Sequence, residues 1–214
     1  MSLPPTVHAI VPLALLEAIR NLDTPLNDGL SAELAQETFT KRFGLTSTVA
    51  AQIERYREMV GKATPVGLDE VVQVFRLVGR RADATLVYAD AGRRAARYSS
   101  RTRGGSPLVW WKLTPKSMRR RAGERAAARA AHRIFGLALV RDSAGIGVAL
   151  TESLATRAGF EGSGCYFYSA LGAELLRVTT GFEGSMLHDR CRSRGDDQCR
   201  WRAAEADQRW QGEG

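Results

Sequence analysis

The chain has 214 residues, with 31 Lys and Arg against 23 Asp and Glu, a formal net charge of +8, and 44% hydrophobic residues. This composition is typical of a folded globular protein and excludes a disordered chain, a collagen or a coiled coil. No apolar run reaches the ~18–20 residues of a membrane span, and no basic segment precedes the first apolar one, so we expect a soluble, cytoplasmic protein without a signal peptide.

Apolar residues at helical spacing predict helices through most of the first hundred residues. Leu13, Leu16 and Ile19 mark the first helix, and Pro12 suits its first turn. Further helices are expected over residues 31–44, 46–60, 69–79 and 82–98, separated by turn clusters rich in Gly, Pro and Asp.

Positive charge is concentrated between residues 93 and 133, where 13 Lys or Arg stand against one acid. The Ala- and Arg-rich residues 119–133 predict a helix on which Arg121, Arg125 and Arg129 form one stripe. Four interpretations of this stripe stay open: a solvated helix face, a contact with an anionic membrane surface, a site for ligand carboxylates, or a nucleic-acid surface. Because no zinc-finger, basic-zipper or helix-turn-helix pattern occurs, we expect no nucleic-acid partner.

Beyond residue 136 the pattern changes to short, β-prone runs. Residues 137–141 and 146–151 predict a hairpin, residues 165–180 a helix that ends at Gly181, and residues 186–191 and 198–203 two more strands. Helices followed by this mixture indicate an α+β fold with an antiparallel sheet and packed helices. We divide the chain into a helical region, residues 1–99, a second domain, residues 100–204, and a flexible tail, residues 205–214.

All three cysteines lie in the last quarter of the chain and, with one histidine, follow the spacing C-x22-H-x2-C-x7-C. The four residues are Cys165, His188, Cys191 and Cys199. Three Cys and one His form a closed tetrahedral ligand set for Zn²⁺, and a turn between the last two cysteines can bring them together. Since no coordination position stays open, the predicted zinc is structural. The alternative is three buried thiols beside an exposed histidine.

The segment over residues 164–201 resembles the C-terminal half of the 4-vinyl reductase domain family, whose final C-x-x-x-G-D-x-x-C is matched by Cys191, Gly195, Asp196 and Cys199. The resemblance covers about residues 100–204. It implies the ligand-binding fold of aromatic-responsive bacterial activators and, more distantly, of TRAPP vesicle-tethering subunits. Phenol- and xylene-sensing members hold zinc at matching spacing, with an acidic residue where this chain has His188. By analogy the resemblance also implies a homodimer.

Within that family, a stand-alone chain of this size is most similar to members from bacteriochlorophyll biosynthesis. The implied function is to bind and handle a tetrapyrrole intermediate, of the Mg-protoporphyrin or protochlorophyllide type, at the 4-vinyl (8-vinyl) reduction step. Other pigment-biosynthesis enzymes and the surface of the photosynthetic membrane are the implied partners.

Whether the protein is an enzyme stays open. The sequence contains no G-x-G-x-x-G after a strand and has too few cysteines for the usual iron–sulfur ligation. One alternative is a true vinyl reductase that uses an external electron donor. Another is a sensor or adaptor for small hydrophobic or aromatic ligands.

Aromatic side chains near arginines suit a flat, apolar macrocycle that carries carboxylates. The candidate ligand-binding residues are Trp110, Trp111, Arg121, Arg125, Arg129, His132 and Tyr166. His132 is also a candidate ligand for the magnesium of a pigment precursor. The alternative is that the aromatic side chains belong to the core and that His132 is an ordinary surface residue.

Overall fold

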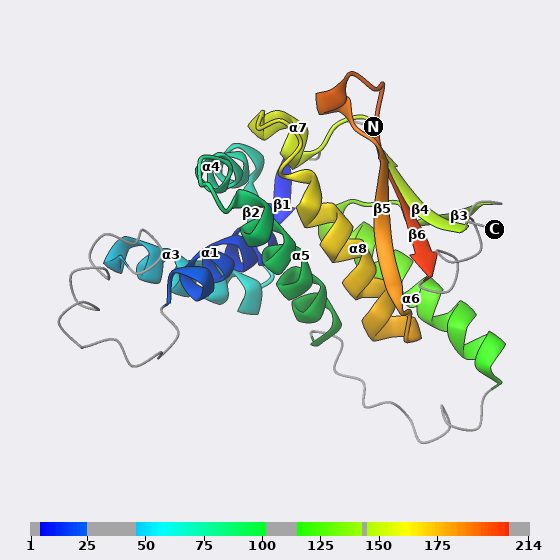
Figure 1. The fold of residues 1–214 in the computed structure, drawn as a ribbon. Helices are drawn as coiled ribbons and strands as arrows, with labels where there is room; N and C mark the ends of the chain where they lie inside the picture. Colours follow the sequence, from blue (N-terminus) through cyan, green and yellow to red (C-terminus); the bar gives the residue numbers. More distant parts are fainter. Residues whose placement is uncertain (1–4, 25–45, 102–114, 143–144, 206–214) are drawn as a thin grey trace, which may run out of the picture.

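The computed structural model describes residues 5–24, 46–101, 115–142 and 145–205 (Figure 1). In chain order the elements are β1 (Thr6–His8), α1 (Ile10–Asp23), α3 (Ser47–Gly61), β2 (Pro65–Gly67), α4 (Leu68–Gly79), α5 (Ala84–Arg101), α6 (Lys116–Phe135), β3 (Val140–Asp142), β4 (Gly145–Leu150), α7 (Leu154–Ala158), α8 (Cys165–Thr180), β5 (Gly184–Arg190), the 3-10 turn η3 (Arg192–Arg194) and β6 (Cys199–Glu205). The predicted α+β class is confirmed. The helix expected over residues 31–44 lies outside the described residues.

The larger sheet has the order β3-β4-β6-β5, and each neighbouring pair is antiparallel. The predicted hairpin is present as β3 and β4, and the two further predicted strands are present as β5 and β6, but β3 begins later than expected. Gly136 takes the left-handed conformation, with φ 64°, and Leu137 donates its N–H to the carbonyl of Ala131 at 3.0 Å. This bond closes the end of α6, so residues 137–139 connect the helix to β3 and are not part of the strand.

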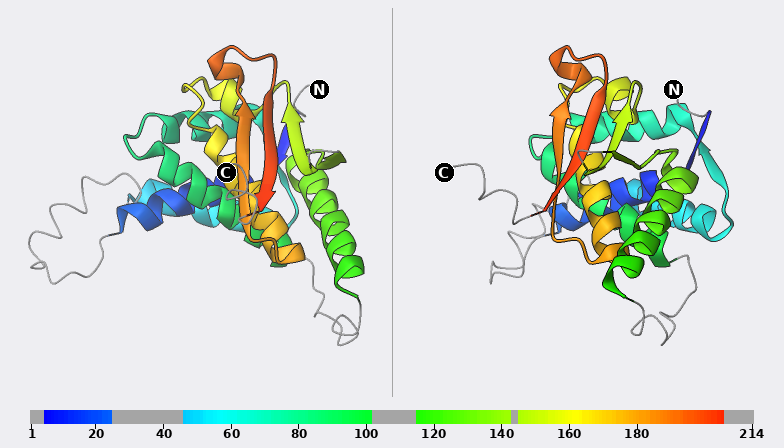
Figure 2. Two further views of the ribbon diagram at one scale, coloured as in Figure 1. Left: turned by 45° about the vertical axis from the view of Figure 1, so that its right-hand side comes forward. Right: turned by 90° about the vertical axis from the view of Figure 1, so that its right-hand side faces the viewer.

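Helix α8 lies between the sheet and the N-terminal helices (Figures 1 and 2). It packs against α5 and α6 on one side and against β5 on the other. A Cβ on Gly92 of α5 would lie 2.3 Å from the carbonyl oxygen of Phe167, and one on Gly123 of α6 would lie 2.2 Å from that of Thr179. Both helices therefore approach α8 as closely as backbone allows, and glycine is what permits it.

One continuous hydrophobic core joins the two predicted regions, because α5 contacts both α1 and α8. The division at residues 99 and 100 stays a prediction. The predicted tail begins one residue too early: Glu205 is the last residue of β6, where it pairs with Gly184 and forms an ion pair with Arg120.

Two small elements were not predicted. Strand β1 pairs antiparallel with β2, so that His8 lies opposite Pro65, although residues 63–67 read as a simple break in the sequence. Helix α7 is one short turn with a capping box, in which Ser153 accepts a hydrogen bond from Thr156 N–H at 3.1 Å. The β1–β2 pair and α7 both lie beside the end of α6 and the start of α8, where they help to line one cavity.

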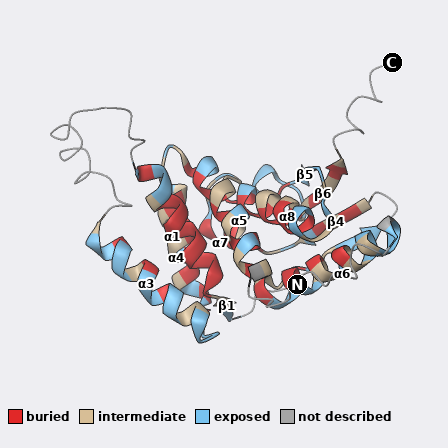
Figure 3. Cartoon of the chain, turned by 90° about the horizontal axis from the view of Figure 1, so that it is seen from below, coloured by how far each residue is buried: buried red, intermediate tan, exposed pale blue. Residues whose placement is uncertain are grey.

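Burial differs sharply between the helices (Figure 3). Helix α1 is buried along nearly its whole length, and its one buried acid near the middle, Glu17, is paired with Arg57 at 2.7 Å. Helix α6 is buried only along one side. No helix in the described part of the chain is long and apolar enough to cross a membrane.

Candidate metal centre and ligand cavity

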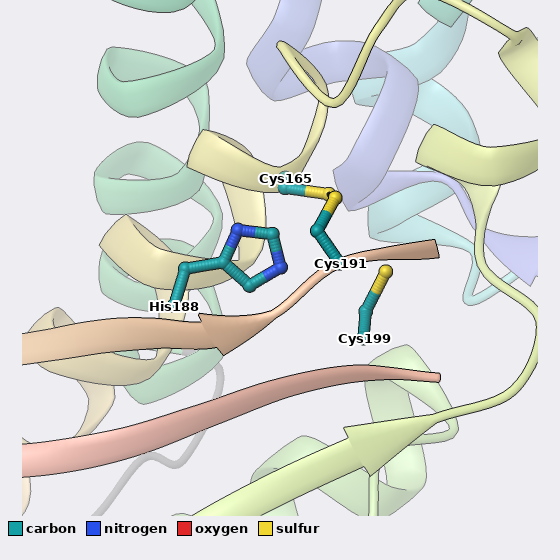
Figure 4. A group of neighbouring side chains, drawn as sticks. All are labelled: Cys165, His188, Cys191 and Cys199. Atoms are coloured by element: carbon teal, nitrogen blue, oxygen red, sulfur yellow. Dashed lines mark hydrogen bonds between the residues drawn. The ribbon is translucent and has the colours of Figure 1, made fainter. Parts of the chain in front are cut away.

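Four side chains meet at one end of the sheet (Figure 4). Cys165 is the first residue of α8, His188 lies in β5, Cys191 follows that strand, and Cys199 begins β6. Their ligand atoms all lie within 4.8 Å of one another, and the sulfurs of Cys165 and Cys191 are 4.0 Å apart. Tetrahedral Zn–S bonds of about 2.3 Å imply sulfurs about 3.8 Å apart. The four residues thus lie together as predicted, and the group can hold a metal ion.

An irregularity in β5 aligns the ligands on one face. His188 is opposite Trp201 and Arg190 is opposite Arg200, so β5 contains one residue more than β6 at this point. In a regular strand His188 and Cys191 would point to opposite faces, because side chains alternate. The extra residue shifts the alternation by one and brings Cys191 to the face that carries His188.

Backbone donors and close packing support the sulfurs. Arg192 donates its N–H to the Cys199 sulfur at 3.4 Å, and the carboxylate of Asp196 accepts the N–H of Cys191 at 2.6 Å. Gly195 takes the left-handed conformation, with φ 96°, that this turn requires. The Gly and Asp of the C-x-x-x-G-D-x-x-C pattern therefore shape the loop that presents two of the thiols.

The histidine supplies a test of whether a metal fits. Its ring stacks on Trp201, with centroids 4.7 Å apart and an interplanar angle of 8°, and its edge faces the three sulfurs (Figure 4). Nε2 of His188 is buried and has no hydrogen-bond partner among the described residues. A buried polar atom without a partner is destabilising, and a bound metal ion would satisfy this nitrogen.

The thiols are not equivalent. Hydrogen bonding from Cys165 is the main cause that lowers the pKa of the Cys199 thiol, and the Arg192 N–H adds to it. The same hydrogen bond, together with burial, raises the pKa of Cys165 well above its ordinary value. Cys199 therefore loses its proton more readily than Cys165. Metal binding must release protons from the thiols, so affinity for a metal falls as the pH falls.

The predicted ligand-binding residues do not form one site in the described part of the chain. Arg121 and Arg125 line a groove of about 720 Å³ between α6 and the β3–β4 hairpin. His132 lines a separate cavity of about 610 Å³ at the other end of α6. Arg129 and Tyr166 are exposed and line neither hollow. Trp110 and Trp111 lie outside the described residues.

The cavity of about 610 Å³ is mainly apolar. Its walls come from β1, β2, the end of α6, β4 and the first turn of α8. They include Val7, Val11, Pro65, Ile134, Phe135, Leu137, Leu150, Leu154, Phe167 and Tyr168. The two aromatic residues Phe167 and Tyr168 follow closely after Cys165 along α8, so the metal centre and the cavity share the first turn of that helix.

The polar side chains that line the same cavity are Thr6, His8, His132, Arg133, Glu152 and the hydroxyl-bearing Tyr168. Glu152 is engaged with Arg157 at 2.8 Å, whereas Arg133 forms no ion pair among the described residues. Burial, and secondarily the charge of Arg133, lowers the pKa of His8. Its ring is therefore neutral at pH 7. Since Nδ1 accepts the Ile10 N–H at 3.2 Å, the ring proton is on Nε2, and His8 is a donor.

Sequence reasoning missed His8. Nothing near it in the chain marks it, because only the pairing of β1 with β2 and the packing of β1 on α6 bring it beside Arg133. No family model, curated protein or solved structure matches the chain. The resemblance to the 4-vinyl reductase family therefore stays a prediction.

Proposed function

We propose that the protein is a 4-vinyl-reductase-type domain that binds a tetrapyrrole intermediate, of the Mg-protoporphyrin or protochlorophyllide type, in the cavity of about 610 Å³. The observation that carries this proposal is the combination of apolar walls with two adjacent donors, His8 and Arg133. Cavities of ~300–1,000 Å³ with few polar groups are typical of small-molecule sites. The proposed setting is the cytoplasmic side of the photosynthetic membrane, as a homodimer that hands its ligand to other pigment-biosynthesis enzymes.

Each polar residue of the cavity would bind a different group of the tetrapyrrole. Arg133 suits a carboxylate of the ligand, and the Nε2–H of His8 suits a second acceptor oxygen. His8 is a poor magnesium ligand, because its Nδ1 is already an acceptor for Ile10 and its Nε2 carries the proton. His132, exposed on the rim, is the candidate for magnesium. Phe167 and Tyr168 would contribute aromatic surface to a flat ring.

We propose that the metal is Zn²⁺ and that its role is structural. Three thiolates and an imidazole match the preferences of zinc, and four protein ligands leave no position for a substrate. The ion would join the start of α8 to β5 and β6. Because Phe167 and Tyr168 lie in that first turn, the zinc would also hold the floor of the cavity in place.

A chromophore titration tests the proposal. Protochlorophyllide or Mg-protoporphyrin added to the full chain should give saturable, stoichiometric binding, followed by absorbance. His8→Ala and Arg133→Ala should weaken it, while Arg80→Ala, at an exposed position remote from the cavity, should not. Turnover of a divinyl substrate with an added reductant would favour a vinyl reductase. Saturable binding of simple aromatics without pigment binding would favour a sensor, and either result would overturn the carrier function.

A further inference from the structure

Helix α6 presents one continuous basic face. At about 100° per residue, Met118, Arg121, Arg125, Arg129 and His132 fall within about 80° of one another around the helix axis. All five are exposed. The opposite face consists of small or aliphatic residues that are buried against the core: Gly123, Ala127, Ala130, Ala131 and Ile134. We refer to the five exposed residues as the α6 stripe.

The arginines of the stripe are not used by the fold. Within the described residues, Arg121, Arg125 and Arg129 form no ion pair. Their neighbour Arg120, on another side of the helix, is paired with both Glu124 and Glu205. Arg120 is thus held by neighbouring carboxylates, whereas the three arginines of the stripe are exposed to solvent. A solvated face is one explanation, but it does not account for the apolar residues that accompany the charges.

Two exposed apolar side chains, Met118 and Val140, lie on or beside the α6 stripe. Met118 and Val140 are each 60% exposed. Few large hydrophobic side chains among the described residues are as exposed as these two. Met118 begins the stripe, and Val140 lies in β3, the edge strand, where it lines the groove that Arg121 and Arg125 also line. Figure 2 shows α6 beside the β3–β4 end of the sheet, so both elements contribute to one surface.

We propose that the α6 stripe and Val140 form a docking surface for an anionic lipid bilayer. Residues 115–142 carry eight Arg or Lys against two acids, which complements negatively charged headgroups. Met118 and Val140 are placed to enter the interface between headgroups and acyl chains, while guanidinium groups stay at the phosphates. A purely electrostatic partner such as duplex DNA would use the arginines but would gain nothing from these two side chains.

Docking by this surface has a consequence for the cavity. The stripe ends at His132, which also lines the cavity of about 610 Å³. A bilayer bound to the stripe would therefore lie against the rim of that cavity, where an apolar ligand could pass between lipid and protein. This consequence rests on the proposed function. The docking itself does not, and vesicle binding can be measured without any ligand.

Vesicle flotation with the full chain tests the docking surface. The wild type should bind vesicles of equimolar phosphatidylcholine and phosphatidylglycerol at least about tenfold more strongly than phosphatidylcholine vesicles, and high salt should weaken that binding. The Arg121→Gln/Arg125→Gln variant should lose about 30-fold in affinity, since each basic residue near an anionic membrane contributes about fivefold. Met118→Ser should lower the binding that remains at high salt.

The matched control is Arg80→Gln/Arg93→Gln, which removes the same charge from exposed positions on α5 and at the end of α4. It should bind as the wild type does, and circular dichroism should show both double variants folded. Equal binding to neutral and anionic vesicles would overturn the proposal, as would equal losses in the two double variants. Binding of duplex DNA that depends on Arg121 and Arg125, without vesicle binding, would also overturn it and make the face a nucleic-acid surface.

Discussion

Replacing Cys199 with Ser should remove the metal and lower the stability of the whole chain. Cys199 is fully buried, and its sulfur lies close to the ligand atoms of Cys165, His188 and Cys191 and accepts the Arg192 N–H. Serine at this position leaves three ligands and a buried hydroxyl, so the metal ion is held weakly or lost. The imidazole nitrogen of His188, which has no partner among the described residues, then stays unsatisfied.

The magnitude follows from these losses. The free energy of metal binding contributes directly to folding. Loss of the buried metal, which leaves the imidazole of His188 unsatisfied, should lower the free energy of unfolding by at least about 3–5 kcal/mol. In a chain of this size each kcal/mol lowers Tm by about 2–4 °C, so Cys199→Ser should melt at least about 6 °C, and up to about 20 °C, below the wild type. Thermal unfolding followed by circular dichroism, with and without a strong chelator, measures this difference.

The response to chelator separates metal loss from an ordinary packing defect. Chelator should lower the Tm of the wild type towards that of Cys199→Ser and should leave the variant unchanged. Ala204→Ser places a hydroxyl at another buried position of β6, so it should be less stable yet keep its response to chelator. If the purified wild type contains less than half an equivalent of metal, or melts at one temperature with and without chelator, the structural metal is refuted.

Three further predictions concern packing, pH and the ligand. Gly92→Ala should destabilise the protein by about 1–3 kcal/mol in urea unfolding, because its Cβ would meet a backbone oxygen of α8 at 2.3 Å, whereas Gly61→Ala, in open space, should be neutral or stabilising. Hydrogen bonds from Arg177 and Arg97 lower the pKa of Glu174 to about 2, so its stabilising contribution should be complete above its ordinary pKa of 4.5 and be lost as the pH falls towards 2. Glu174→Gln should therefore flatten the stability profile in this range and lower stability at pH 7, and an unchanged profile would contradict the assignment. His8→Ala should weaken pigment binding by about fivefold, since one hydrogen bond contributes about 1 kcal/mol, and should leave the response of Tm to chelator unchanged; equal affinity would mean that the ligand does not reach His8.

Much of the fold could be predicted from the sequence alone. Apart from the short α7, the helices of the described residues follow from local periodicity and from their stop signals, such as Gly181, which takes the left-handed conformation with φ 74°. The four metal ligands could be named because their residue types and spacing are specific to metal binding, and a turn between two of them makes the approach local. The arginine stripe is likewise a property of one helix, since residues four apart share a face.

The remaining features depend on contacts between distant parts of the chain. The extra residue in β5 that aligns His188 with Cys191 appears only against its partner strand, and β1 exists only because it pairs with β2. The candidate ligand residues looked like one group in the sequence, yet the structure assigns Arg121 and His132 to separate hollows and adds His8 from the other end of the chain. Spacing along the chain determines which residues share a helix face or a turn. Which faces meet is decided by tertiary packing, because side chains far apart in sequence become neighbours only when the core closes.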